Sequence, residues 1–176
     1  MIDFTKSKQY TLSIRLSTDG FSFSIYNPIH DDSLSIIEKE IDTSLSLTAN
    51  LKAVFHESDF LNHPYKRVNI MMASKRFTIA PLDLFEEGQA ELLFYHNHQK
   101  RENETVLYNI LRKNNVAVIF GIDKSAQTFL NEQYPEARFY SQSTPFIDYF
   151  SVKSRLGNSK KMYASVRKDG IAVSYT

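Results

Sequence analysis

The sequence predicts an α/β fold built on a mixed sheet. Strand and helix patterns follow one another in the order hairpin, third strand, helix, strand, helix, hairpin, helix, strand, helix. Strands that come first in a hairpin and later between helices are typical of a sheet that is antiparallel at its start and parallel further on. The 176 residues, of which 42% are hydrophobic, suffice for one domain, or for one domain and a piece of another.

The first hairpin is the clearest element. Apolar residues alternate with polar ones over residues 12–16 and again over residues 21–25, as in two half-buried strands. Between the two runs Asp19-Gly20 supplies a tight turn, and Pro28 ends the second strand. A third strand is expected over residues 33–41.

Helices and strands then alternate along the chain. We expect, in order, a helix capped by Thr43, Ser44 or Ser46 and closed by Pro64, a buried strand at 67–74, a strand and then a helix within 77–95, a polar loop at 96–104, a hairpin over 106–122, a helix at 124–135 and a strand at 137–141. A final helix over residues 143–157 has Thr144 as its cap, Pro145 in its first turn and Gly157 at its end.

Composition narrows the function classes. Cysteine is absent, so the chain has no disulfide, thiolate nucleophile or thiolate zinc ligand. The net charge of +1 disfavours a nucleic-acid partner, and basic pairs such as Lys75-Arg76 and Lys100-Arg101 are expected to be solvated loop charges. There is no apolar run near twenty residues and no secretory signal, which predicts a cytoplasmic protein without membrane insertion.

The last residues repeat the pattern of the first hairpin. Val166 stands 150 residues after Leu16, and Asp169-Gly170 stands at the same offset from Asp19-Gly20. The apolar positions that follow each turn match as well, without a gap. The repeat follows a complete α/β unit, as expected where an internally duplicated protein begins its second half.

Four stretches carry a resemblance to a known superfamily: "LSIRLSTDGFSFSIYN", "FTIAPLDLF", "ARFYSQSTPFIDYF" and "KMYASVRKDGIAVSY". The chain resembles the actin-like ATPases, in which two α/β halves each open with strand, glycine-containing turn, strand, third strand and helix. Within that fold it is most similar to an uncharacterised bacterial family, the domain of unknown function numbered 3822, and it is distantly similar to the actin-like proteins of type IV pilus assembly.

The resemblance implies a domain organisation. Residues 1–158 are expected to form a first half with a mixed, ribonuclease-H-like or actin-like sheet, with a subdomain inserted at about residues 75–122. Residues 159–176 are expected to be the opening hairpin of a second, similar half, because members of the family look longer.

In active members of the superfamily the first turn reads Asp-x-Gly-(Thr/Ser). Its carboxylate positions a metal-bound water, and its amides and hydroxyl meet the nucleotide phosphates. The resemblance carries these roles over to two candidate phosphate turns, made of Ser17, Thr18, Asp19 and Gly20 and of Asp169 and Gly170.

Both turns depart from the motif. Thr18 and Lys168 stand where the carboxylate belongs, and Phe21 and Ile171 stand where the hydroxyl belongs. Asp19 and Asp169 are therefore interpreted as turn residues, and ATP with Mg²⁺ is not an expected cofactor, although the missing second half leaves nucleotide binding open.

Two metal-based alternatives have less support. His96 and His98 would present two imidazoles on one side of an extended segment, and His30-Asp31-Asp32 reads as a turn, but neither group has an evident further ligand. A ribonuclease-H-like nuclease needs a carboxylate inside its first strand, and no Asp or Glu lies between Tyr10 and Ser17.

The sequence therefore predicts a catalytically degenerate actin-like protein that acts by binding a protein partner. Self-association is expected through the C-terminal hairpin at residues 160–176, whose outer edges invite further strand pairing. The alternative is a nucleotide-binding ATPase or phosphotransferase whose site needs the second half.

Overall fold

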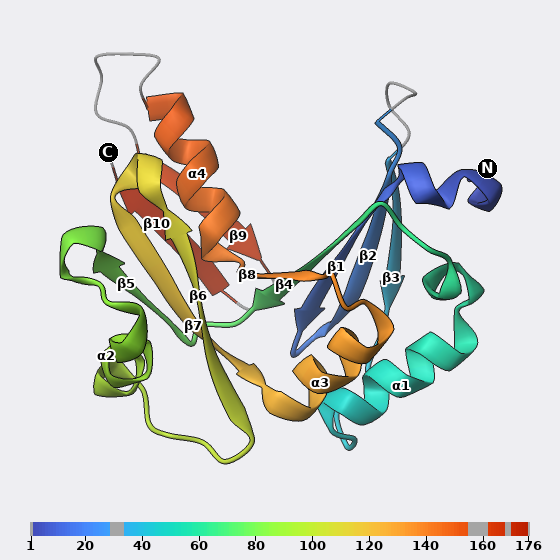
Figure 1. Ribbon diagram of the computed structural model, residues 1–176, viewed down its shortest axis with the longest axis horizontal. Helices are drawn as coiled ribbons and strands as arrows, with labels where there is room; N and C mark the ends of the chain where they lie inside the picture. Colours follow the sequence, from blue (N-terminus) through green and yellow to red (C-terminus); the bar gives the residue numbers. More distant parts are fainter. Residues whose placement is uncertain (1, 29–33, 155–161, 168–169, 176) are drawn as a thin grey trace.

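The computed structural model describes residues 2–28, 34–154, 162–167 and 170–175, and places them in two sheets, a separate hairpin and four α-helices (Figure 1). The candidate turn at His30-Asp31-Asp32, as well as Gly157 and Asp169, lies outside the described residues.

The main sheet is mixed, as the sequence predicts. Its strand order is β3-β2-β1-β4-β8; β1 pairs antiparallel with β2, β2 antiparallel with β3, β1 parallel with β4, and β4 parallel with β8. The strands are β1 (Thr11–Ser17), β2 (Gly20–Tyr26), β3 (Leu34–Lys39), β4 (Arg67–Ala73) and β8 (Arg138–Ser141). The fold class is confirmed, with β1 at the centre of the sheet.

The alternating pattern of the first hairpin builds the core. Leu12, Ile14 and Leu16 on β1 are fully buried, while the residues between them are only half-buried. The buried face packs against α1 (Leu47–Glu57) and α3 (Lys124–Gln133), which lie beside one another in Figure 1. Ser46 caps α1 by accepting a hydrogen bond from the Ala49 amide at 3.1 Å.

A second sheet lies in the sequence between β4 and β8. It has the order β5-β7-β6, all antiparallel, and consists of β5 (Phe77–Pro81), β6 (Glu104–Leu111) and β7 (Val116–Asp123). The helix α2 (Ala90–Asn97) packs on it through the fully buried Phe94. This sheet occupies the stretch predicted to be inserted, and its division from the rest as a domain stays a prediction.

Short 3₁₀ turns occupy several of the connections. They span Phe4–Gln9, Asp59–Asn62, Leu82–Leu84, Glu87–Gln89 and Arg112–Asn114.

The two sheets are joined through Asn109 on β6. Its amide nitrogen donates to the Phe139 carbonyl at 2.9 Å, and its oxygen accepts from the Ser141 amide at 3.0 Å and from the Thr144 hydroxyl at 2.7 Å. The prediction that Thr144 caps the last helix was wrong, because α4 already begins at Ser143 (Ser143–Ser154) and the Thr144 hydroxyl turns to Asn109 instead.

The C-terminal hairpin repeats the register of the first. Leu12 lies opposite Ile25 and Leu16 opposite Phe21 in β1–β2; Met162 lies opposite Tyr175 and Val166 opposite Ile171 in β9–β10. The strands are β9 (Met162–Arg167) and β10 (Gly170–Tyr175). Each pair is shifted by 150 residues, so the predicted hairpin is confirmed, while internal duplication stays a prediction.

Candidate functional site

The first candidate phosphate turn joins β1 to β2, and its polar groups bind one another. The buried Ser17 hydroxyl donates to the Asp19 carboxylate, and the Asp19 amide donates back to the Ser17 hydroxyl at 3.3 Å. The same carboxylate lies 3.8 Å from the Arg15 guanidinium. Asp19 therefore closes the turn with its side chain, in the way short polar residues commonly do.

Gly20 is required by the backbone of this turn. Its φ is +149°, and a Cβ at this position would lie 2.9 Å from the Lys39 carbonyl on β3. Both facts exclude a larger residue without a shift of β3. The glycine is thus explained by the packing of the three antiparallel strands, with no ligand needed to account for it.

The position of the motif's hydroxyl is taken by a core residue. Phe21 is 2% exposed and belongs to the main hydrophobic cluster, so its side chain packs inside the domain. In the second turn, Gly170 pairs with Arg167 across the β9–β10 hairpin. The structure thus brings Ser17, Asp19 and Gly20 together by hydrogen bonding and strand packing. It gives Thr18 no comparable contact with them.

The two histidines predicted as a metal alternative are not presented by an extended segment. His96 lies in the last turn of α2, and the His98 Nε2 donates to the Phe77 carbonyl at 3.1 Å while its ring packs on Phe94. Nowhere in the part of the chain that the structure describes do three His, Asp or Glu side chains gather as they would around a metal ion.

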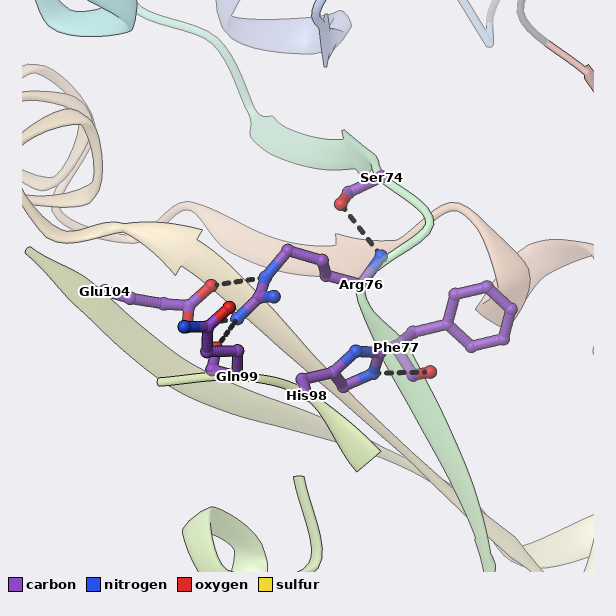
Figure 2. Close-up of polar contacts among 6 residues, drawn as sticks. All are labelled: Ser74, Arg76, Phe77, His98, Gln99 and Glu104. Atoms are coloured by element: carbon purple, nitrogen blue, oxygen red, sulfur yellow. Dashed lines mark hydrogen bonds and ion pairs between the residues drawn. The ribbon is translucent and has the colours of Figure 1, made fainter. Parts of the chain in front are cut away.

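Next to His98, a buried ion pair connects distant segments (Figure 2). The Arg76 guanidinium donates to both carboxylate oxygens of Glu104, at 2.9 and 2.7 Å, and also to the Gln99 carbonyl at 2.9 Å. The exposed fractions of the two side chains are 16% and 7%. The prediction that Lys75-Arg76 is a solvated basic pair was therefore wrong for Arg76, because its partner lies 28 residues away in the sequence.

The face of the main sheet opposite α1 and α3 carries a groove that the sequence reasoning missed. Its volume is about 700 Å³, and it extends from β3 across β2, β1 and β4 to β8 and α4. It is lined by Ser13, Arg15, Ser22, Ser24, Leu34, Ile36, Arg67, Asn69, Met71, Leu111, Arg138, Tyr140, Thr144, Pro145 and Asp148, and by part of Ile14. The alternation of polar and apolar residues in β1 and β2 indicated such a face.

The sheet register arranges the groove in rows. Ile36, Ser24, Ser13, Asn69 and Arg138 lie opposite one another in one row across all five strands. Arg67 lies two residues before Asn69 on β4, on the same side of the sheet. The groove therefore has an apolar end at β3 and a cationic end at β4 and β8.

Among the described residues, no helix has both the length and the apolar character that crossing a bilayer requires.

Comparison with known proteins gives a family and a fold. The profile of a family described as "Protein of unknown function (DUF3822)" matches residues 1–176. A crystal structure of a Bacteroides thetaiotaomicron protein, described as having an actin-like ATPase fold and unknown function, is 81% identical, with a TM-score of 0.93. The match covers 100% of this chain and 68% of that one. No curated protein matches the sequence.

Proposed function

The chain belongs to the DUF3822 family of proteins of unknown function and has the actin-like ATPase fold, and we propose that it acts as a protein-binding or scaffolding module that does not hydrolyse ATP. The proposed site of action is the reducing cytoplasm, consistent with the absence of cysteine.

The state of the β1–β2 turn carries this proposal. Hydrolysis in this fold would use a carboxylate to orient a metal-bound water and a hydroxyl to meet the phosphates. The first position is Thr18, and the second is Phe21, whose ring is buried in the core. The nearby carboxylate of Asp19 is already bonded to Ser17 and lies close to Arg15. Fold alone does not imply activity, so the residues at these positions are what supports the proposal that the protein does not hydrolyse ATP.

A second candidate is a nucleotide-binding ATPase or phosphotransferase whose site needs residues outside this chain. One observation favours it: the chain spans only 68% of the Bacteroides thetaiotaomicron protein, so a larger relative has additional residues to contribute. Under this alternative the Ser17–Gly20 turn would still supply backbone amides to a phosphate.

Calorimetric titration separates the two candidates. ATP and ADP, each with Mg²⁺, are titrated up to millimolar concentration into this chain and into the longer Bacteroides thetaiotaomicron protein, and phosphate release is measured in parallel. We expect no binding heat and no phosphate from either protein. Binding by the longer protein alone would favour the second candidate, and phosphate release would overturn the proposal.

If heat appears, two matched variants locate it. Asp19→Asn alters the turn, whereas Asp59→Asn changes an exposed aspartate in the turn after α1. Loss of binding in Asp19→Asn alone would place the nucleotide at the β1–β2 turn.

A further inference from the structure

The groove on the main sheet is a surface that the described residues leave open. We propose that it is a docking surface for an amphipathic α-helix of a protein partner, with carboxylates of that helix facing Arg67 and Arg138. This inference rests on the proposed protein-binding function and names the surface and the chemistry of the partner.

The topology of the sheet indicates that a helix belongs on this face. Strands β1, β4 and β8 are parallel, and parallel strands are almost always covered by helices on both faces. One face is covered here by α1 and α3, and the β1 side chains on that face, Leu12, Ile14 and Leu16, are 0% exposed. On the other face, Ser13 and Arg15 of the central strand are only half-buried and line the groove. A central strand with one uncovered face leaves room for a further layer.

The end of the groove at β3 would accept the apolar side of such a helix. Leu34 and Ile36, on the edge strand, are 55% and 62% exposed, and Tyr26 on β2 is 48% exposed. Met71 on β4 and Leu111 on β6 add apolar lining further along. Tyr26 and Leu34 lie opposite one another on neighbouring strands, so these side chains are adjacent, and a contiguous exposed apolar patch is typical of an interaction site.

The charges of the groove favour an acidic partner. Three arginines and one aspartate line it. Arg15 lies 3.8 Å from Asp19, whereas the guanidinium groups of Arg67 and Arg138 have no hydrogen bond or ion pair to any described residue. Arginine is well suited to bind carboxylates through paired hydrogen bonds at an interface. A carboxylate on the docked helix would thus neutralise the cationic end.

The size of the groove fits a helix. It crosses the sheet from β3 to β8, which is four interstrand steps or about 19 Å. A helix with its side chains is about 10–12 Å in diameter, so one helix fits on this face beside α4. Recognition would follow the helix-in-groove mode, with apolar anchors spaced at i, i+3, i+4 and i+7.

Selection from a displayed peptide library tests the proposal. The peptides have about 20 residues, long enough to form a helix alone, with a fixed leucine stripe and either Glu or Lys at every flanking position. We expect selection on the full chain to enrich Glu over Lys. The double variant R67E/R138E should bind the selected peptides about tenfold more weakly or worse, and selection repeated on that variant should enrich Lys.

The double variant K100E/R101E is the matched control, because it makes the same charge change in the exposed loop between α2 and β6. It should bind the selected peptides like the native chain, and circular dichroism checks that both variants remain folded. Enrichment without a charge preference, unchanged binding to R67E/R138E, loss of binding in K100E/R101E, or no enriched peptide would each overturn the proposal. The nucleotide titration tests the proposed function independently of the peptide selection. A failure of the docking proposal can therefore be distinguished from a failure of the proposed function.

Discussion

Arg76 and Glu104 form a two-point ion pair that links the β4–β5 connection to the start of β6. The Arg76 Nε and terminal nitrogen donate to separate oxygens of Glu104, and the guanidinium also lies 5.4 Å from the centre of the Phe94 ring. Gly121 on β7 lies against this pair, because a Cβ there would lie 2.8 Å from the Glu104 Cδ and 3.0 Å from Phe94. The pair therefore fills the space in which three segments of the second sheet meet α2.

Removing the charge of Glu104 should destabilise the protein strongly. Glu104→Gln keeps the shape of the side chain but leaves the Arg76 cation, only 16% exposed, without its counter-charge. We expect the free energy of unfolding to fall by about 2–4 kcal/mol, as measured by urea denaturation. The matched control Glu102→Gln changes an exposed carboxylate two residues away and should have little effect. Equal effects of the two substitutions would contradict the role given to the ion pair.

Replacing Asn109 should loosen the contact between the two sheets. Asn109→Ala leaves the Ser141 amide and the Thr144 hydroxyl, on residues that are 1% and 5% exposed, without their acceptor. Unpaired buried donors cost about 2–3 kcal/mol in total, so the urea midpoint should fall accordingly. Asn97→Ala, at an exposed amide on α2, is the control and should change the midpoint little. An unchanged midpoint for Asn109→Ala would show that water satisfies both donors.

A methyl group at Gly20 should strain the β1–β2 turn. Gly20→Ala forces a side chain into the φ of +149° and brings its Cβ to 2.9 Å from the Lys39 carbonyl. We expect a loss of about 1–3 kcal/mol in the free energy of unfolding. Gly88→Ala is the control, because no atom lies within 4 Å of the added Cβ. If neither substitution changes the thermal melting temperature, β3 shifts easily to accommodate the added methyl group. The close approach of Lys39 would then not explain why position 20 is a glycine.

The sequence predicts the local elements of this protein well and its long-range contacts poorly. The period-2 pattern from Leu12 to Ile25 predicts β1, β2 and the buried side of each, because both strands belong to one local hairpin. The pairing of β5 with β7 places Phe77 opposite Phe120, and these two residues lie far apart in the sequence. No local sequence pattern predicts a contact between such distant residues. Thr144 illustrates the same difficulty. Its residue type is suited to capping a helix, but its hydroxyl binds Asn109, which lies 35 residues away in the sequence.

The candidate site was predictable only where it is local. Asp19-Gly20 was correctly interpreted as a turn, since its hydrogen bonds stay within three residues. The groove was not predicted from the sequence, because Arg67 and Arg138 come together only when β4 pairs in parallel with β8. In the sequence each of these arginines is a single basic residue at the start of a short strand.

Alkaline pH should weaken the fold through a half-buried tyrosine, Tyr65. Burial raises the pKa of Tyr65 from 10.0 to about 12, and its hydroxyl donates to the Phe60 carbonyl at 2.7 Å. The pKa of Tyr134 is also raised by burial, and its hydroxyl donates to the Leu61 carbonyl. A pKa raised by folding gives stability that is present below pH 10 and is lost as the pH rises toward 12.

The Tyr65→Phe variant tests this pH dependence. It should begin with a lower free energy of unfolding at pH 8, by about 1 kcal/mol for the lost hydrogen bond, and then lose less stability than the native chain between pH 10 and 12. Tyr26→Phe, at a ring 48% exposed, is the control and should keep the native slope. Identical slopes for all three proteins would show that Tyr65 ionises in the folded state without penalty.

The C-terminal hairpin should mediate self-association. Strands β9 and β10 pair with one another in a two-stranded sheet, which no other described strand joins, so both outer edges keep unpaired backbone groups. Such edges readily pair with a second copy of the same chain. Light scattering at tens of micromolar should therefore show a dimer. A proline in place of Val173 on β10, whose N–H points away from β9, should shift the dimer toward the monomer by removing a backbone donor from the outer edge. A native chain that stays strictly monomeric at this concentration would remove the idea, as would a dimer indifferent to the substitution.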